Sequence, residues 1–256
     1  MILVIPAIEL RNGQCRRRIL GEPGMEAYYD YLVAHPHEVA RLLRQENART
    51  LHIVDLDALD CRPTVATRQA IEHIIDAVDI PIELLSAFPD IDECLYWIDK
   101  GAFRLVLTEM IVTVPDQVKH LVAKYSSSRI VAGIRARNRV LHIAGQQIDD
   151  VAFAAMAKAC GIRRIIYSDI AWEGTYQGPD FDVIKSFAQA TCMNITVAGG
   201  IDTPEELWRC NQMQPLGVDS VIVGRAIAEN RFPCQHIWRK VESLLQKNFP
   251  LPSENS

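Results

Sequence analysis

The sequence predicts a single (β/α)8 barrel with an internal half-barrel duplication, and three observations indicate this fold. Short β-branched runs alternate with amphipathic stretches along the whole chain. The length of 256 residues suits one barrel of this kind. Insertions at 10–34 and 134–146 follow the first and fifth strands, which are equivalent places in two four-strand halves.

Each element is predicted from hydrophobic periodicity and from the turn residues that bound it. The expected strands are 2–5, 50–54, 80–84, 104–107, 129–132, 163–167, 194–197 and 219–223. The expected helices that follow them are 37–46, 65–77, 90–100, 114–124, 149–159, 180–190, 203–213 and 234–247. The barrel domain is therefore assigned to 1–247, and the polar segment 248–256 to a C-terminal tail.

Local signals refine three of these elements. The helix 203–213 opens with Asp202-Thr203-Pro204-Glu205-Glu206, which offers a cap candidate, a proline in the first turn and acids where the helix dipole favours them. Asn12 and Gly13 predict a hairpin turn in the first insertion. The apolar and polar residues of 140–143 predict a further strand in the second insertion.

Composition and charge exclude several classes of function. Hydrophobic residues make up 49% of the chain and charged residues 23%, and the formal net charge is −5, which gives no reason to expect nucleic acid or an anionic membrane surface as partner. No apolar run has the length of a membrane span. The seven cysteines form no C-x-x-C motif, which predicts reduced thiols and a cytoplasmic protein. No metal ligand set is evident.

Two glycine-containing turns near the end of the chain predict a phosphate site. Gly199 and Gly200 follow one strand, and Gly224 and Arg225 follow the next. Glycine lets backbone N–H groups approach an anion closely, and a helix start favours negative charge. The alternative is that these residues only form turns.

Several motifs occur in the order of a known family. They are Ile5-Pro6-Ala7-Ile8-Glu9-Leu10-Arg11-Asn12-Gly13, His52-Ile53-Val54-Asp55-Leu56, Ser168-Asp169-Ile170-x-x-Glu173-Gly174-Thr175, Ala198-Gly199-Gly200-Ile201 and Val223-Gly224-Arg225-Ala226. Together they resemble the histidine-biosynthesis (β/α)8 barrels, and the ribotide isomerases of that family more than its cyclase subunits. The resemblance implies a substrate with two phosphates, an Amadori rearrangement, and no cofactor. It also implies acids that move protons at the ends of strands 1 and 5, and Thr175 among the ligand-binding residues.

The first half of the chain departs from that pattern at the second phosphate site. The resemblance implies glycines after strands 3 and 4, but 82–89 and 106–110 contain none. Glu83 and Glu109 are expected to add negative charge near this place, which disfavours a phosphate. Hydroxyl groups in the same segments are still able to donate hydrogen bonds to a neutral group.

The proton-transferring acids also differ. Glu9 stands at the strand 1 position and is one methylene longer than the aspartate implied there. No carboxylate lies between Asp116 and Asp149, and Arg135 is expected to occupy the strand 5 position, where a guanidinium serves as an anion ligand. Glu9 is interpreted as a general base or as the partner of an arginine, Arg135 being one choice across the barrel mouth.

Asp169 ends strand 6, and residues at the carboxyl ends of barrel strands face the site, so Asp169 is predicted as the second acid rather than a structural cap. Trp172 is expected to cover the core, although stacking on a ligand ring is the alternative. His52 is predicted to be a hydrogen-bonded core histidine.

The function predicted from these residues is that of a divergent ribotide isomerase relative acting on a monophosphorylated sugar or nucleotide-derived metabolite. Activity on the family's own substrate is expected to be low. One alternative is a non-catalytic protein that binds a phosphorylated metabolite. Another is an enzyme of a different cofactor pathway, such as pterin synthesis.

Overall fold

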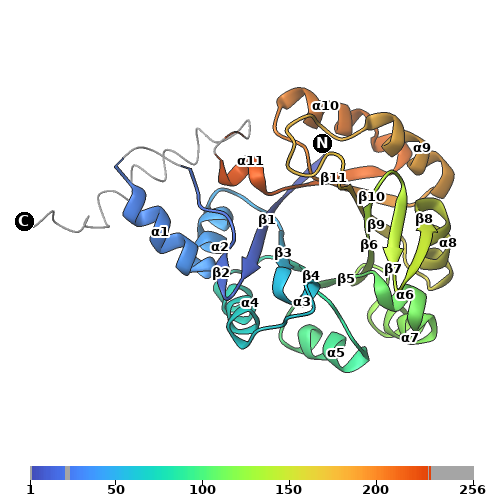
Figure 1. Cartoon of the computed structure of the whole chain (residues 1–256), viewed down its shortest axis with the longest axis horizontal. Helices are drawn as coiled ribbons and strands as arrows, with labels where there is room; N and C mark the ends of the chain where they lie inside the picture. Colours follow the sequence, from blue (N-terminus) through green and yellow to red (C-terminus); the bar gives the residue numbers. More distant parts are fainter. Residues whose placement is uncertain (1, 21–23, 230, 232–256) are drawn as a thin grey trace, which may run out of the picture.

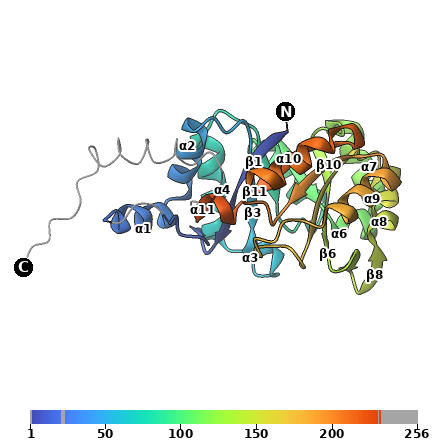
Figure 2. The same cartoon turned by 90° about the horizontal axis from the view of Figure 1, so that it is seen from above.

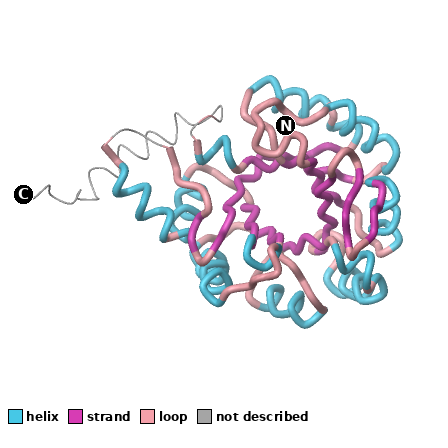
Figure 3. The backbone as a smooth tube through the Cα atoms, viewed as in Figure 1, coloured by secondary structure: helices cyan, strands magenta, loops and turns pink. Residues whose placement is uncertain are grey.

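The chain forms a closed barrel of parallel strands in the computed structural model, which describes residues 2–20, 24–229 and 231 (Figures 1 and 3). Around the barrel, the strands are β1 (Leu3–Arg11), β3 (Leu51–Asp55), β4 (Ile82–Leu85), β5 (Arg104–Leu107), β6 (Ile130–Ala136), β9 (Arg164–Asp169), β10 (Asn194–Ala198) and β11 (Val218–Val223). Parallel pairing of β11 with β1 closes the ring. The predicted (β/α)8 barrel is thereby confirmed.

Helices connect successive strands and cover the outside of the barrel (Figure 3). They are α2 (Pro36–Gln45), α4 (Val65–Ala77), α5 (Ile91–Asp99), α7 (Pro115–Tyr125), α8 (Asp150–Ala159), α9 (Phe181–Thr191) and α10 (Pro204–Gln212). Shorter elements in the connections are α1 (Glu26–Ala34), α3 (Leu56–Leu59), α6 (Glu109–Thr113), a 3-10 turn (Gln214–Leu216) and α11 (Arg225–Ala228). The predicted helix 234–247 and tail 248–256 lie outside the described residues.

Side-chain caps set where several of these helices begin. Thr64 accepts a hydrogen bond from the backbone N–H of Thr67 at the start of α4. Thr203 and Glu206 form a reciprocal capping box at the start of α10, with Pro204 in the first turn, as the sequence predicts. None of the described helices is long and apolar enough to span a membrane.

Side chains on the strands alternate between the barrel interior and the surrounding helices. Ile5, Val106, Val131, Ile166 and Ile222 pack together although they come from strands that are not all neighbours, which places them inside the barrel. The residues between them belong to the larger core against the helices. This alternation decides which side chains reach the barrel mouth, the end where the carboxyl ends of the strands meet.

A layer of polar side chains fills the interior toward the other end of the barrel. Glu83 is 1% exposed, and its carboxylate accepts hydrogen bonds from His52 Nδ1 at 2.8 Å and Arg104 Nη1 at 2.9 Å. Leu85 follows Glu83 on the same face of β4 and lies nearer the mouth. The expectation that Glu83 adds charge near the mouth is therefore wrong, because two residues of strand separate it from that end. His52 is confirmed as a hydrogen-bonded core residue.

The second half of the barrel contributes a matching set to this layer. Arg164 donates to both oxygens of Asp219 at 2.6 Å, and also to Thr196 Oγ1 and Ser220 Oγ at 3.1 Å. These residues come from β9, β10 and β11, whereas His52, Glu83 and Arg104 come from β3, β4 and β5. Each half of the barrel thus pairs its own interior charges.

Two hairpins extend the loops that follow the first and fifth barrel strands. In the first, β1 pairs with β2 (Gln14–Cys15) across a turn in which Asn12 and Gly13 have φ of 50° and 77°, which confirms the predicted hairpin turn. In the second, β7 (Val140–Ile143) pairs with β8 (Gln146–Asp149), which confirms the predicted strand. Figure 2 shows β8 and α3 on the side opposite the chain start. The duplication of half-barrels stays a prediction that these equivalent places favour.

Replacing Glu83 by alanine is expected to lower the free energy of unfolding by about 3 kcal/mol, because the buried His52 and the half-buried Arg104 guanidinium lose their shared carboxylate. Chemical denaturation at neutral pH measures this loss. The control is Asp116→Ala, which removes an exposed ion pair with Lys119 and should change stability little. Equal effects of the two substitutions would contradict the role of Glu83.

The pH dependence of the stabilisation by Glu83 follows from the direction in which the pKa of Glu83 is shifted. Burial alone would raise the pKa of Glu83, but the hydrogen bonds and charges of His52 and Arg104 outweigh it and lower that pKa. The stabilisation is therefore complete above about pH 4.3, the ordinary value for glutamate, and is lost as the pH falls through the lower folded value. The stability difference between the wild type and Glu83→Ala should shrink over that acid range.

Candidate functional site

Two glycine turns form one side of the barrel mouth. Gly199 and Gly200 follow β10 with φ of 87° and 79°, in the left-handed region. A Cβ on Gly200 would lie 3.0 Å from the backbone carbon of Gly178, so this turn has no room for a side chain. A Cβ on Gly224, after β11, would lie 3.9 Å from Glu9 Oε1. The second glycine turn is therefore a direct neighbour of Glu9.

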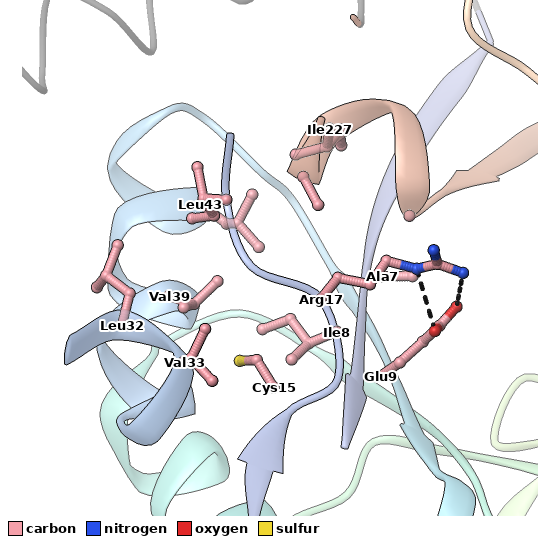
Figure 4. Close-up of a pocket in the computed structure, with 13 residues that line it drawn as sticks. Ala7, Ile8, Glu9, Cys15, Arg17, Leu32, Val33, Val39, Leu43 and Ile227 are labelled. Carbon is pink, nitrogen blue, oxygen red and sulfur yellow. Dashed lines mark hydrogen bonds and ion pairs between the residues drawn. The ribbon is translucent and has the colours of Figure 1, made fainter. Parts of the chain in front are cut away.

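Glu9 lies on the interior face of β1 and is paired with arginines of the following loop. Arg17 donates to its two carboxylate oxygens at 3.2 and 3.3 Å (Figure 4). Arg16 also donates to Glu9, at 3.4 Å. Arg135, the partner considered from the sequence, forms no ion pair with Glu9 among the described contacts; its partner is Glu173. Glu9 thus lies at the mouth in a half-buried ion pair within its own loop.

Arg135 and Glu173 form a second ion pair at the mouth. Arg135 shares the interior face of β6 with Val131 and Gly133, and its Nε and Nη2 lie 2.8 Å from Glu173 Oε2. The hydrogen bond that Arg135 donates to the Glu173 carboxylate raises the pKa of Arg135. Carboxylates are absent from β6, so Arg135 is the ionic side chain that this strand offers to the mouth.

Glu173 is a mouth residue that the sequence reasoning missed. It lies in the loop after β9, and a Cβ on Gly199 would be 3.2 Å from its Cγ. The sequence signal was its position four residues after the end of a barrel strand, inside the motif that ends in Gly174 and Thr175. Loop geometry rather than strand periodicity turns it toward the mouth.

Asp169 is placed differently from the sequence prediction. It shares a face of β9 with Ile165 and Tyr167, which pack in the core against the helices, and it is 2% exposed. Its carboxylate accepts the backbone N–H of Ala171 at 2.9 Å and of Arg139 at 3.3 Å. The geometry therefore gives Asp169 the structural role of tying two loops together, in place of the predicted second acid, because β9 alternation turns it away from the mouth.

The remaining predicted residues mostly bond within the loops. The guanidinium of Arg225 donates to Glu229 Oε1 at 2.6 Å and to the carbonyl oxygen of Gly174. Thr175 Oγ1 donates to the carbonyl oxygen of Trp172 at 3.0 Å. Trp172 is 5% exposed and donates to the carbonyl oxygen of Ala198, which confirms that it covers the core. Arg225 therefore offers a ligand its backbone N–H rather than its side chain.

The other half of the mouth has no comparable glycine turn. Thr108 Oγ1 donates to the carbonyl oxygen of Gly133 at 2.9 Å, and Ser86 Oγ donates to Asp55 Oδ2 at 3.3 Å. Burial raises the pKa of Asp55. Glu109 is exposed at the start of α6. Asp55 and Ser86 are buried and share strand faces with Ile53 and Leu84 of the core against the helices, so Thr108 and Glu109 are the polar side chains that this side offers to the mouth.

A pocket lies behind the Glu9–Arg17 pair (Figure 4). Gly224 and Glu9 lie at its polar edge, and most of the remaining lining is apolar, including Leu32, Val39 and Leu43 of α1 and α2. The ion pair is thus in contact with apolar side chains on the side away from the mouth. Among the residues that the structure describes, no group of three or more His, Cys, Asp or Glu side chains is arranged to hold a metal ion.

Comparison with known proteins places these features in a family. A model of the histidine biosynthesis protein family matches residues 3–233, which include every barrel strand described above. The chain belongs to this histidine biosynthesis family. The match covers both glycine turns, Glu9 and Glu173, so all of these mouth residues lie in the part of the chain that the family model describes.

Curated members of the histidine biosynthesis family resemble the chain over nearly its whole length. A protein from Pelodictyon phaeoclathratiforme is 38% identical over 97% of this chain and 98% of its own length. Proteins from Salinibacter ruber and Chloroherpeton thalassium are 38% and 36% identical, over 93% and 97% of this chain and 93% and 95% of their own lengths. All three are named 1-(5-phosphoribosyl)-5-((5-phosphoribosylamino)methylideneamino)imidazole-4-carboxamide isomerase. The chain is thus a relative of that isomerase.

Replacing Asp169 by asparagine is expected to lower the free energy of unfolding by about 1–3 kcal/mol, because an amide cannot accept both buried N–H groups without turning its own NH2 toward one of them. Chemical denaturation measures the loss. Unchanged stability would contradict the structural role assigned to this carboxylate.

Proposed function

We propose that this chain is an isomerase that moves a proton between adjacent carbons of a phosphorylated sugar-like metabolite. Glu9 and Glu173 are the two carboxylates that would move it. The observation that carries the proposal is that each carboxylate adjoins a glycine turn, Glu9 beside Gly224 and Glu173 beside Gly199. A ligand whose phosphate sits at these turns would extend between the two carboxylates. The isomerase names of the relatives agree with this chemistry.

The proposed step is an aldose–ketose rearrangement of the Amadori type. One carboxylate removes the proton on C2 of the open-chain imine or aldehyde, and a C1=C2 double bond forms as the nitrogen or oxygen on C1 takes up a proton. The C2 hydroxyl then loses its proton to become the carbonyl group, and C1 receives a proton. Atoms and charge balance without a cofactor, because the proton lost at C2 is replaced at C1 and the hydroxyl proton is replaced on the nitrogen or oxygen. Arg135, held by Glu173, is suited to contact an oxygen of the substrate between the two carboxylates.

The geometry favours a substrate anchored by one phosphate. Backbone N–H groups at Gly199–Gly200 and Gly224–Arg225 would bind it. The opposite side of the mouth lacks such a turn, and the Glu109 carboxylate would repel a second phosphate there. The compound in the relatives' name carries two phosphoribosyl groups. Because this mouth offers a glycine turn pair on one side only, we infer that the chain prefers a related compound with a single phosphate. We also infer that it acts in the cytoplasm.

A second candidate is a protein that binds the same ligand without turning it over. The observation in its favour is that both mouth carboxylates are paired with arginines, Glu9 with Arg17 and Glu173 with Arg135. A carboxylate that keeps such a partner has fewer free oxygens to direct at a substrate proton than one that releases its arginine on binding. Turnover separates the two functions. Nothing in the described mouth favours a different cofactor pathway such as pterin synthesis.

Replacing Glu9 or Glu173 by glutamine is expected to lower kcat by about a hundredfold or more, because an amide cannot transfer the proton. Turnover is measured with the relatives' substrate and with a phosphoribosylamino compound that carries one phosphate, and the latter should be the better substrate. The matched carboxylate-to-amide control is Asp116→Asn on α7. Undiminished turnover in Glu173→Gln would contradict the assignment. Full rescue of a histidine auxotroph that lacks the isomerase would contradict the substrate preference.

Inorganic phosphate is expected to raise the thermal unfolding midpoint of the wild type, whereas Gly200→Glu should abolish this shift by filling the turn with a charged side chain. At 100 times the dissociation constant, the added stability is about 2.7 kcal/mol. Gly224→Ala tests the same site with little strain, because its Cβ would lie 3.5 Å from the nearest atom, and should weaken the shift. Chloride at equal ionic strength is the control. Equal shifts in all three proteins would exclude phosphate binding at these turns.

A further inference from the structure

The loop that carries Glu173 touches both glycine turns. We name residues 170–180, between β9 and α9, the bridging loop. On one side, the Gly178 backbone packs against Gly200 so closely that a Cβ there would be 3.0 Å away. On the other side, the carbonyl oxygen of Gly174 accepts a hydrogen bond from Arg225 Nη1. The bridging loop therefore contacts the first turn through Gly178 and the second turn through Gly174, the residue after Glu173.

Tyr176 holds the Arg225 side of this arrangement together. Two guanidinium groups lie over its ring, with the Cζ atom of Arg225 4.3 Å and that of Arg231 4.0 Å from the ring centroid. Its hydroxyl donates to Glu229 Oε2, and Glu229 Oε1 accepts a hydrogen bond from Arg225 Nε at 2.6 Å. Tyr176 and Glu229 thus fix the Arg225 side chain from two directions.

The backbone of Tyr176 has an unfavourable conformation that contacts with other segments must stabilise. Tyr176 has φ of 57°, in the left-handed region that a residue with a bulky side chain rarely adopts. Burial, together with the Glu229 carboxylate, raises the pKa of Tyr176, so the phenol keeps its proton and remains a donor. The ring contacts and this hydrogen bond compensate for the strained backbone. The conformation of Tyr176 therefore depends on contacts with Arg225, Glu229 and Arg231, which lie outside its own loop.

We propose that Tyr176 is a positioning residue that couples occupancy of the glycine turns to the placement of the Glu173 carboxylate. The inference rests on the phosphate site of the proposed function. Arg225 is the connection, because its backbone N–H belongs to the second turn while its side chain binds the carbonyl of Gly174, the residue after Glu173. A phosphate that orders the turn also orders the bridging loop, and with it the acid.

If Tyr176 only stabilised the fold, its effect on the bridging loop would be the same with and without a ligand. The test therefore compares hydrogen–deuterium exchange in the presence and absence of inorganic phosphate. Hydrogen–deuterium exchange is measured at the backbone amides of 173–178 in the wild type, Tyr176→Phe, Tyr176→Leu and Arg225→Met. Tyr176→Phe keeps the stacked ring, whereas Tyr176→Leu and Arg225→Met remove the connection in different ways. The matched control is Tyr125→Leu, at the end of α7. Calorimetry sets a phosphate concentration that saturates each variant, and circular dichroism checks that each is folded.

In the wild type and the Tyr125 control, phosphate should slow exchange of 173–178 by about fivefold or more. Tyr176→Phe should keep most of this slowing, and Tyr176→Leu and Arg225→Met should lose it while phosphate still binds. Phosphate binding without slower exchange in the wild type, or slowing that survives in Tyr176→Leu and Arg225→Met, would overturn the coupling and leave the phosphate site standing. Absence of phosphate binding by the wild type would overturn both.

Discussion

The two-residue alternation along the barrel strands is the constraint on which the rest of this site depends. Closing a parallel sheet brings all strand ends to one mouth, but only every second side chain of each strand faces inward. Glu9 and Arg135 face inward on β1 and β6, whereas Asp169 falls on the opposite face of β9 and packs toward the helices. One residue of displacement therefore separates a mouth carboxylate from a structural one.

This constraint explains which features were predictable from the sequence. Strands and helices follow from hydrophobic period, capping residues and turn residues, and the predicted helix 65–77 coincides with α4. The hairpin at Asn12 and Gly13 was predictable because its turn needs positive φ. Asp169 and Glu83 were misplaced because proximity to a strand end was considered without the face of the strand or the distance from the mouth.

Loop residues were harder to predict, because no periodicity governs them. Glu173 and Arg17 reach the mouth through turns whose course depends on contacts with distant segments, such as the packing of Gly178 against Gly200. The outcome is a mouth in which acids and arginines alternate: Arg17, Glu9, Arg135 and Glu173. The guanidinium groups of Arg17 and Arg135 are already paired, so an anion that bound to either of them would have to replace a carboxylate.

The polar layer inside the barrel has a consequence for how such a fold can be assembled. Each half-barrel holds its own acid–base pair in this layer, Glu83 with Arg104 and His52 in one half, and the partly exposed Asp219 with Arg164 in the other. Each of these carboxylates therefore has a hydrogen-bonded counter-ion within its own half. A half of this kind is a self-sufficient electrostatic module, which can be copied, exchanged with an equivalent half or separated at the seam without exposing the interior to an unbalanced charge.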